Sequence, residues 1–434
     1  MFKNAVKAIV MAIIIFEARI VLKKYKPRII AVTGSVGKTS TKDAIYSALR
    51  SSLFIRKSRK SFNSEIGIPI TIIGCDSGWN SPVKWLKNIF EGLALIFLPN
   101  HYPKWLVLEV GTDHPGDIKE VAKWLKPEVV VITALPDVPV HVGNFKDASE
   151  VVKEKKELVK AMRKNGALVL AGDDKLTAAL SKEFPDASTY LYGVEAHNDV
   201  SASNINFQYK DGKLDGMKFR VEESGSSMPI EIRDRVGHHQ VYPVLAAFAV
   251  ARALDTSPIS AAKALVIEKG PNGRMKILKG FNSTTLIDDS YNSSPSAVRA
   301  ALTTLKKIEV SGKKIAVLGD MLELGRYSAE AHKKVGVQVA GVADILVTVG
   351  TRAKGIVESA KKNGFSPAKI FEFNDGKSKE AGKKVRELLE EGDVVLLKGS
   401  QTGIRLEKAI RELMEDPSRS KELLVRQNEE WLRI

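Results

Sequence analysis

From residue 28 onward, the chain alternates short apolar runs with segments that have helical spacing. The runs are four to six residues long, as is typical of strands buried on both faces of a parallel sheet. The clearest predicted strands of the first half are residues 29–32, 105–110, 129–133 and 167–171. A second series predicts strands at residues 285–288, 314–318, 345–349 and 394–398. This alternation predicts an α/β fold with parallel sheets.

Two breaks in the pattern divide the chain. Residues 199–235 change to short polar–apolar alternation punctuated by glycines, which predicts antiparallel hairpins added to the sheet. The stretch "EKGPNGRMKIL" holds Gly270, Pro271 and Gly273 and predicts a domain boundary. We therefore predict an apolar and basic N-terminal helix (1–27), a central domain (28–272) and a C-terminal domain (273–434).

The first 28 residues leave three interpretations open. Their longest uninterrupted apolar run is residues 8–16, whereas a membrane-spanning helix needs about 20 predominantly apolar residues. The helix could pack on the following domain, or it could lie on a membrane surface with the basic residues of 23–28 facing acidic lipid. A spanning helix is the third interpretation. No small-residue cleavage site follows, so no removable signal peptide is expected.

Composition narrows the class of protein. A chain of 434 residues is too long for one core, and 44% hydrophobic with 27% charged residues is typical of a globular protein. The single cysteine, Cys75, excludes an internal disulfide framework and fits a reducing cytosol. The net charge of +16 suits anionic small molecules, a membrane surface or nucleic acid. Because no zinc-knuckle spacing, RNA-binding aromatic motif or long basic tail is present, we expect no nucleic-acid partner.

The segment "TGSVGKTS" after the first strand has the pattern of a phosphate-binding loop. Gly34 and Gly37 allow the backbone N–H groups to turn toward phosphate oxygens, Lys38 can reach the terminal phosphates, and the Thr39 hydroxyl can bind Mg²⁺. Val32 stands where the widespread pattern has its first glycine, so the match is to a shortened variant, G-x-x-G-K-T. The segment predicts a nucleotide site.

Other candidate residues follow the predicted strands. Glu109 comes at the carboxyl end of an apolar strand, where parallel sheets bind ligands; a buried carboxylate there is either ion-paired or metal-bound. His141 follows the next strand, although a lone loop histidine is usually only solvated. The helix that contains "KEKKELV" is by default a charged surface helix.

Several segments together resemble the Mur ligases, the ATP-dependent amide-bond enzymes of cell-wall precursor synthesis. The first three are "TGSVGKTSTK", "FNSEIGIP" and "LEVGTDHPGDI". Three more, "LIDDSYNSSPSAVRAAL", "IAVLGDMLELG" and "VLLKGSQTGIRLEKAI", resemble the branch that adds D-alanyl-D-alanine to UDP-N-acetylmuramoyl-tripeptide. The resemblance runs from residue 28 to about residue 413. It implies a central P-loop ATPase domain with a mostly parallel sheet and a C-terminal Rossmann-like α/β domain.

The resemblance also implies roles for individual residues. The implied ATP-binding residues are Gly34, Ser35, Val36, Gly37, Lys38, Thr39, Ser40, Gln240, Arg274 and Asp289. The implied metal ligands, for two Mg²⁺ ions, are Thr39, Glu109, His141 and Lys155, and the implied catalytic residues are Lys38, Glu109, His141 and Lys155. In the family this lysine is carbamylated by CO₂, and Lys153 and Lys156 are one alignment slip away from it. The expected substrate-binding residues are Asn63, Glu65, Asn292, Lys398 and Ser400; for the last three, a strand-end or capping role is an equal alternative.

Two departures from the family pattern stand out. Where the family has two asparagines in its adenine-side helix, this chain has Gln240 and Pro243, and a proline side chain cannot form a hydrogen bond to the base. The family's UDP-binding domain usually precedes the phosphate loop, and we expect this chain to lack it. The carrier on the acceptor peptide is therefore open: a uridine handle held by something else, no such handle, or a lipid-linked peptide.

The function implied is ligation through an acyl phosphate, with ATP, a peptide precursor and D-alanyl-D-alanine as small-molecule substrates. The alternatives are a related ligase with another acceptor, such as a folyl-polyglutamate or an archaeal wall peptide, and a non-catalytic ATP-binding partner subunit. The "DDSYN" segment argues against the folate version. We expect a monomer in the cytoplasm; peripheral contact with the inner face of the membrane through residues 1–28 is the location that the membrane-surface interpretation of this helix implies.

Overall fold

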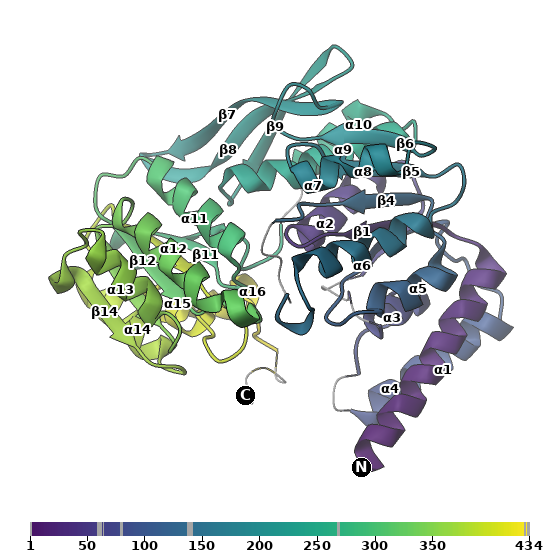
Figure 1. The fold of residues 1–434 in the computed structure, drawn as a ribbon, viewed down its shortest axis with the longest axis horizontal. Helices are drawn as coiled ribbons and strands as arrows, with labels where there is room; N and C mark the ends of the chain where they lie inside the picture. Colours follow the sequence, from purple (N-terminus) through teal and green to yellow (C-terminus); the bar gives the residue numbers. More distant parts are fainter. Residues whose placement is uncertain are drawn as a thin grey trace.

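The computed structural model describes residues 2–58, 63, 65–78, 81–136, 142–266, 270–428 and 431. These residues form two α/β units, each built on its own sheet, and a helix pair that projects from the first unit (Figure 1). The predicted α/β fold class, with two mostly parallel sheets, is confirmed.

The first sheet, in the part of the chain that is described, has nine strands in the order β2-β3-β1-β4-β5-β6-β7-β8-β9. β1 lies in the middle and pairs in parallel with β3 and β4, while β7, β8 and β9 form the antiparallel extension that the glycine-punctuated segment predicts. The bounds are β1 Arg28–Thr33, β2 Ile55–Lys57, β3 Trp105–Glu109, β4 Val129–Ile132, β5 Ala167–Ala171, β6 Ser188–Tyr192, β7 Val200–Lys210, β8 Lys213–Glu223 and β9 Ser226–Arg233.

Helices cover both faces of this sheet, because its central strands are apolar on both sides. Ile30 and Val32 of β1 pack against one group of helices, and Ile29 and Ala31 pack against the other. The first group is α2 Lys38–Leu49, α9 Val241–Ala253 and α10 Pro258–Val266. The second is α1 Phe2–Tyr25, α3 Gly67–Ile73, α5 Asp117–Leu125 and α6 Ala148–Lys160. Two short helices, α7 Lys175–Ala178 and α8 Leu180–Glu183, follow β5.

The second sheet has six strands among the described residues, in the order β10-β11-β15-β12-β13-β14, with only β10 antiparallel to its neighbour. Its strands are β10 Lys276–Lys279, β11 Thr285–Asp289, β12 Lys314–Gly319, β13 Ile345–Val349, β14 Ile370–Phe373 and β15 Val394–Lys398. One face is covered by α11 Pro295–Lys307, α12 Ser328–Ala340 and α13 Lys354–Lys362, and the other by α14 Ser378–Leu388 and α15 Glu407–Leu413. The short α16 Ser420–Leu423 follows α15. The boundary at residues 272–273 stays a prediction; α10 ends at Val266 and β10 begins at Lys276.

The N-terminal helix packs on the structure that follows it. Ile14, Ala18 and Val21 of α1 are buried against α3 and α4, the latter spanning Pro82–Phe97. The two long helices run in the same direction, because Glu17 lies against Gly92 and Lys24 Nζ donates to the carbonyl oxygens of Leu95, Ile96 and Leu98 at 2.9–3.0 Å. Among the described residues, no helix is both long enough and apolar enough to cross a bilayer.

Glu17 is an unusual residue for a helix interface. Its side chain is buried, neither carboxylate oxygen has a hydrogen-bond partner among the residues that the structure describes, and a Cβ at Gly92 would overlap with its Oε2. Burial raises the pKa of Glu17 from 4.5 to about 7. The free energy of unfolding therefore falls as pH rises from about 4.5 to about 7, since the unfolded chain releases this proton first.

Glu17→Gln is expected to stabilise the protein at pH 8 by about 2 kcal/mol, allowing for solvent around the helix pair, and to change stability little at pH 5. Urea unfolding of both proteins at the two pH values measures this difference. Equal stabilisation at both pH values would show that ionisation of Glu17 is not the cause.

Candidate active site

The phosphate loop connects β1 to α2 in a conformation that requires its glycines. Gly34 has φ +137°, and a Cβ there would overlap with the Thr133 side chain. Gly37 has φ +86° and is the N-cap of α2. Both values lie in the region that only glycine adopts without strain. The loop therefore presents its backbone and the positive end of the α2 dipole to the same space, as an anion site does.

Lys38 is the first residue of α2, and its Nζ donates to the Gly34 carbonyl oxygen at 3.0 Å. Burial lowers the pKa of Lys38, and the negative charge of Glu109 partly opposes that effect. A half-buried cation held across its own loop is in position to bind the terminal phosphates of a nucleotide.

Glu109, the last residue of β3, connects the loop to a neighbouring segment. Its Oε2 accepts a hydrogen bond from Thr39 Oγ1 at 2.9 Å, and its Oε1 accepts one from Asn63 Nδ2 at 3.3 Å. The carboxylate is 2% exposed. A hydroxyl and a carboxylate at this spacing are oxygen ligands of the kind that Mg²⁺ binds together with phosphate oxygens and water, so the donor set fits a magnesium nucleotide.

The lysines of α6 differ sharply in environment. Lys155 is 3% exposed, whereas Lys153 is exposed and Lys156 forms an ion pair with Glu183 at 2.8 Å. Burial, followed by the positive charge of Lys38, places the pKa of Lys155 well below its ordinary value. The default interpretation of this helix as a charged surface helix is therefore wrong at residue 155, which is the one buried lysine of these three.

Two adjoining cavities lie between the two α/β units. The polar one, about 280 Å³, is lined by Lys38, Thr39 and Glu109 from the first unit and by Arg274 and Asn292 from the second. The other, about 230 Å³, has a mainly apolar lining that includes Gln240 and Pro243. The cavities share Val36, Gly37, Thr39, Arg274 and Ala297. This arrangement suits phosphates and metal on one side of the loop and a nucleobase on the other.

Arg274 and Gln240 are joined at the border of these cavities. The Arg274 guanidinium lies over the Tyr291 ring at 4.2 Å, and Gln240 Nε2 donates to the Arg274 carbonyl oxygen at 3.2 Å. The amide of Gln240 thus orients the backbone of Arg274. Pro243 contributes only apolar surface to the base-side cavity.

A buried ion pair forms the floor of this region. Lys398 Nζ lies 2.6 Å from Asp289 Oδ2 and also donates to the Asn292 carbonyl oxygen at 3.0 Å. The other oxygen of Asp289 accepts from the Met275 N–H at 3.2 Å. Burial lowers the pKa of Lys398, against the attraction of Asp289. This network fixes the loop after β11 relative to β15.

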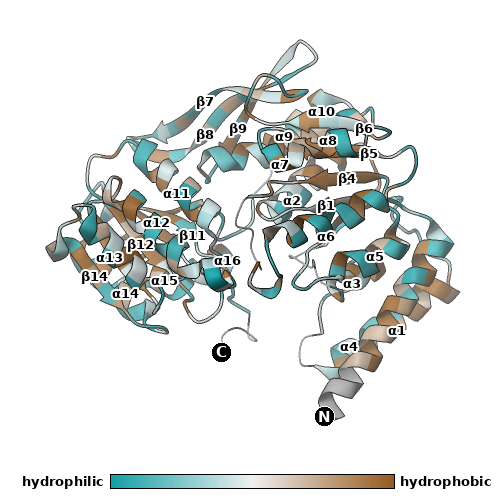
Figure 2. Ribbon diagram, viewed as in Figure 1, coloured by the Kyte–Doolittle hydropathy of each residue, from teal (hydrophilic) through white to brown (hydrophobic). Residues whose placement is uncertain are grey.

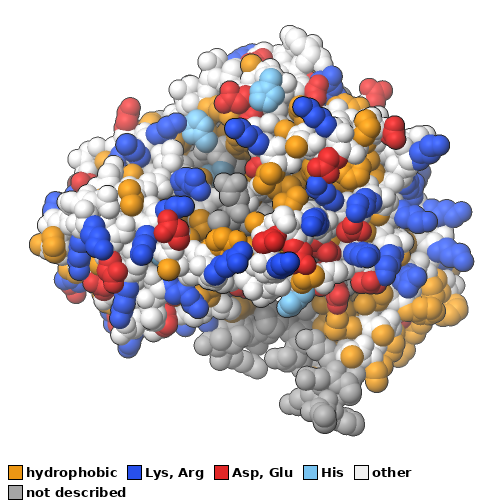
Figure 3. All heavy atoms as spheres, viewed as in Figure 1, with side chains coloured by type: hydrophobic (Ala, Val, Ile, Leu, Met, Phe, Trp, Pro, Cys, Tyr) orange, Lys and Arg blue, Asp and Glu red, His pale blue; other side chains and the backbone are white. Residues whose placement is uncertain are grey.

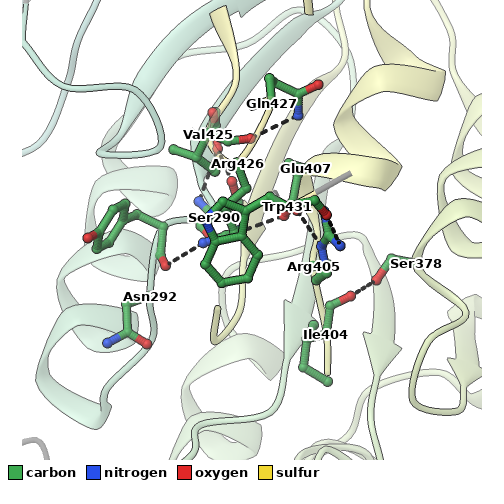
Figure 4. A network of polar contacts seen from close by, with 12 residues as sticks. Ser290, Asn292, Ser378, Ile404, Arg405, Glu407, Val425, Arg426, Gln427 and Trp431 are labelled. Atoms are coloured by element: carbon green, nitrogen blue, oxygen red, sulfur yellow. Dashed lines mark hydrogen bonds and ion pairs between the residues drawn. The ribbon is translucent and has the colours of Figure 1, made fainter. Parts of the chain in front are cut away.

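The C-terminal segment also binds the loop after β11 (Figure 4). Arg426 donates to the carbonyl oxygens of Ser290 and Tyr291, at 2.6 and 3.0 Å, and pairs with the buried Glu407 at 2.8 Å. Arg405 also binds Glu407, at 2.8 Å. Nothing in the sequence pattern singled out Arg426, because the carbonyl groups that it binds lie 135–136 residues away in the chain.

Most predicted site residues meet at the cavities. Those lining one or both are Ser35, Val36, Gly37, Lys38, Thr39, Ser40, Asn63, Glu109, Gln240, Arg274, Asp289, Asn292 and Lys398. Gly34 shapes the loop, and Glu65 lines a neighbouring cavity of about 180 Å³. Ser400 Oγ accepts from the Leu322 N–H at 3.0 Å, which is the structural alternative left open for it. His141 lies outside the described residues.

Several further residues line the cavities without having been predicted from the sequence: Asp113, His239, Tyr291, Glu323 and Gln401. Asp113 and Tyr291 stand inside segments already noted, "GTDHPGD" and "DDSYN", so their motif neighbours could have indicated them. Within the described part of the chain, no group of three or more His, Cys, Asp or Glu side chains is arranged to hold a metal ion.

Comparison with family models decides the family. The Mur ligase middle domain matches residues 32–251, and the Mur ligase glutamate ligase domain matches residues 273–401. The chain belongs to the Mur ligase family. The family resemblance of the motifs is thereby confirmed.

Similar Mur ligases come from several bacteria. The chain is 28% identical over 401 residues to a UDP-N-acetylmuramoyl-tripeptide–D-alanyl-D-alanine ligase of Bacillus subtilis, covering 92% of this chain and 79% of the relative. It is 29% identical over 392 residues to the ligase of that name from Mycobacterium tuberculosis, covering 86% and 70%.

Solved structures share the fold. MurF from Acinetobacter baumannii superposes with a TM-score of 0.76 at 24% identity, covering 94% of this chain and 81% of that one. The MurF ligase of Thermotoga maritima in complex with ADP gives 0.74 at 24% identity, covering 95% and 84%. A pseudomurein peptide ligase type C from Methanothermus fervidus gives 0.63 at 20% identity, covering 89% and 79%.

Proposed function

We propose that this Mur ligase joins D-alanyl-D-alanine to a muramoyl-tripeptide, forming an amide bond at the expense of ATP. The observation that carries the proposal is the polar cavity, where Lys38, Thr39 and Glu109 of one unit face Arg274 and Asn292 of the other. The curated relatives of Bacillus subtilis and Mycobacterium tuberculosis, named for this reaction, support the choice of substrates.

The reaction requires two steps at this site. In the first, the terminal carboxylate of the tripeptide attacks the γ-phosphate, giving an acyl phosphate and ADP. In the second, the amine of the dipeptide attacks the activated carbonyl, and phosphate leaves from a tetrahedral intermediate. Lys38 and the N-terminus of α2 oppose the repulsion between two anions in the first step. Thr39 and Glu109 would hold Mg²⁺, which supplies further charge neutralisation when it is bound.

Lys155 is proposed to carry a carbamate, and His141 is proposed as a second metal ligand. The support for the carbamate is chemical: CO₂ adds to a neutral amine with loss of one proton, and burial lowers the pKa of Lys155 well below its ordinary value, which favours the neutral amine. The carbamate would replace this buried amine by an anionic oxygen ligand near Lys38. Two Mg²⁺ ions, a monomeric state and a cytoplasmic location at the inner face of the membrane complete the proposal.

The first test is phosphate release by the purified protein with ATP and Mg²⁺. D-alanyl-D-alanine and UDP-N-acetylmuramoyl-tripeptide are added separately and together, with chelated Mg²⁺ as the background. Release that requires both substrates is the expected result. If no phosphate is released even when both substrates are present, this substrate pair is rejected. That result would favour the alternative, a related Mur-type ligase with a lipid-linked or other acceptor.

Gln240→Leu is expected to raise the KM for ATP about fivefold with little change in kcat, because one hydrogen bond that orients Arg274 is lost outside the reacting centre. Steady-state kinetics with varied ATP measure the effect. The matched control is Gln338→Leu. It removes a similar hydrogen bond, from the side-chain amide of Gln338 to the Arg299 carbonyl oxygen at 3.1 Å, away from both cavities. An unchanged KM in the Gln240 variant would contradict this role.

A further inference from the structure

Helix α4 exposes an apolar stripe to solvent. Val83, Leu86, Phe90, Leu93 and Phe97 recur at intervals of three and four residues and are 36–77% exposed. Such spacing in a water-soluble protein normally marks the face that enters the core. Here the opposite face of α4 does so, where Asn88, Gly92 and Leu95 are buried.

Helix α1 continues the stripe. Ile9, Ile13 and Phe16 are exposed at the same helical spacing, and Leu98 follows the end of α4. Hydrophobic positions run along both helices (Figure 2), and the hydrophobic side chains gather at the lower right of the surface, where the helix pair lies (Figure 3). We define the α1–α4 apolar face as these nine residues. They are nine of the sixteen exposed large hydrophobic residues in the described part of the chain, so the face is a concentration and not scatter.

The exposed charge around this face is mainly positive. Residues 8–28 and 81–104 contain eight lysines and arginines, and all eight are exposed. The same two segments contain two glutamates, of which Glu17 is buried and only Glu91 is exposed. The eight basic residues are Arg19, Lys23, Lys24, Lys26, Arg28, Lys84, Lys87 and Lys104. Basic side chains next to exposed phenylalanine and leucine are complementary to a surface with an anionic outer layer over an apolar layer.

We propose that the α1–α4 apolar face docks on the surface of an anionic phospholipid bilayer. Phe16, Phe90 and Phe97 enter the boundary between headgroups and acyl chains, and Lys84 and Lys87 of the same helix contact lipid phosphates. A second copy of the chain is the less favourable occupant, because a symmetric contact through this face would bring two basic rims together.

Helix α1 also borders a cavity beside the candidate active site. Met11 lines the cavity of about 180 Å³, which shares Asn63 and Asp113 with the polar cavity. Helix α1 therefore carries the apolar face on one side and borders this cavity through Met11, which is not one of the nine face residues. The inference concerns where the protein binds and does not depend on which acceptor it uses.

The test is co-sedimentation of the full-length chain with vesicles. One set is phosphatidylcholine alone, and the other is an equal mixture of phosphatidylcholine and phosphatidylglycerol. Phe16→Ser/Phe90→Ser/Phe97→Ser is expected to weaken binding to the mixed vesicles on the order of 100-fold, because three interfacial aromatic side chains are lost. Lys84→Glu/Lys87→Glu is expected to weaken it about tenfold or more, and added salt should do the same.

The matched control is Ile259→Ser/Val337→Ser, since these side chains are 62% and 53% exposed and lie outside the face. It should pellet like the wild type. Equal pelleting of the wild type and the triple variant would overturn the proposal, as would a wild type that stays in the supernatant. Light scattering on the purified proteins tests the other occupant. If the wild type is a dimer, the triple variant is a monomer and neither binds vesicles, the face is assigned to a second copy of the chain instead.

Discussion

Replacing Lys155 by alanine is expected to lower kcat on the order of 1000-fold. The amine is buried on α6 near the positive charge of Lys38, and burial, followed by that charge, lowers its pKa. The proposed carbamate would supply two oxygens that can bind a metal ion, and alanine removes them. Phosphate release under saturating substrates measures the loss, and intact mass of the wild-type protein in bicarbonate tests for the added CO₂.

Lys153→Ala is the matched control, because Lys153 is an exposed lysine on the same helix. Its kcat should stay within about twofold of the wild type, as surface changes rarely matter. Activity of the wild type should fall when CO₂ is removed from the buffer, while the Lys155 variant should not respond. A Lys155 variant within a few-fold of wild-type activity would exclude a catalytic carbamate at this position.

Local sequence signals were sufficient to predict the phosphate-loop geometry and the position of Glu109 beside it. The strand-to-helix break at "TGSVGKTS" determines the loop geometry almost alone, because Gly34 and Gly37 are needed for their positive φ values. Glu109 was predictable because the end of a buried parallel strand next to β1 is the edge at which ligands bind. Gly34 contacts Thr133 and Glu109 binds Thr39, and in each pair the two residues lie at or after the ends of neighbouring strands of one sheet.

Burial and long-range contacts were not predictable in this way. The sequence of α6 contains seven charged residues, so no local pattern distinguishes Lys155 from Lys153. Only the packing of α6 against α5 and the sheet does so. Arg426 reaches the loop after β11 across 135 residues of sequence, with no local signal. The orientation of α4 on α1 was also not predictable, because the exposed stripe of α4 has the spacing of a face that enters the core.

Lys398→Met is expected to lower the free energy of unfolding by about 3–5 kcal/mol, the usual effect of leaving one buried charge without its partner. Lys398 is 1% exposed, and its loss would leave Asp289 with only the Met275 N–H as a described hydrogen-bond partner. The loop at residues 290–292 also loses the bond from Lys398 to the Asn292 carbonyl oxygen, so the KM for ATP should rise as well. Urea unfolding and ATP kinetics on the same variant measure the two effects.

The double variant Lys398→Met/Asp289→Asn separates the ion pair from simple loss of packing. If an unpaired buried carboxylate is the cause, removing its charge should restore part of the lost stability, and the two single changes should not add. Lys334→Met is the matched control, because it breaks an ion pair with Glu330 on the surface of α12, where both side chains are mostly exposed. Its cost should stay below about 0.5 kcal/mol. Additive losses in the double variant would mean that Lys398 and Asp289 stabilise the domain independently, and that the loop beside the nucleotide cavity is held mainly by Arg426.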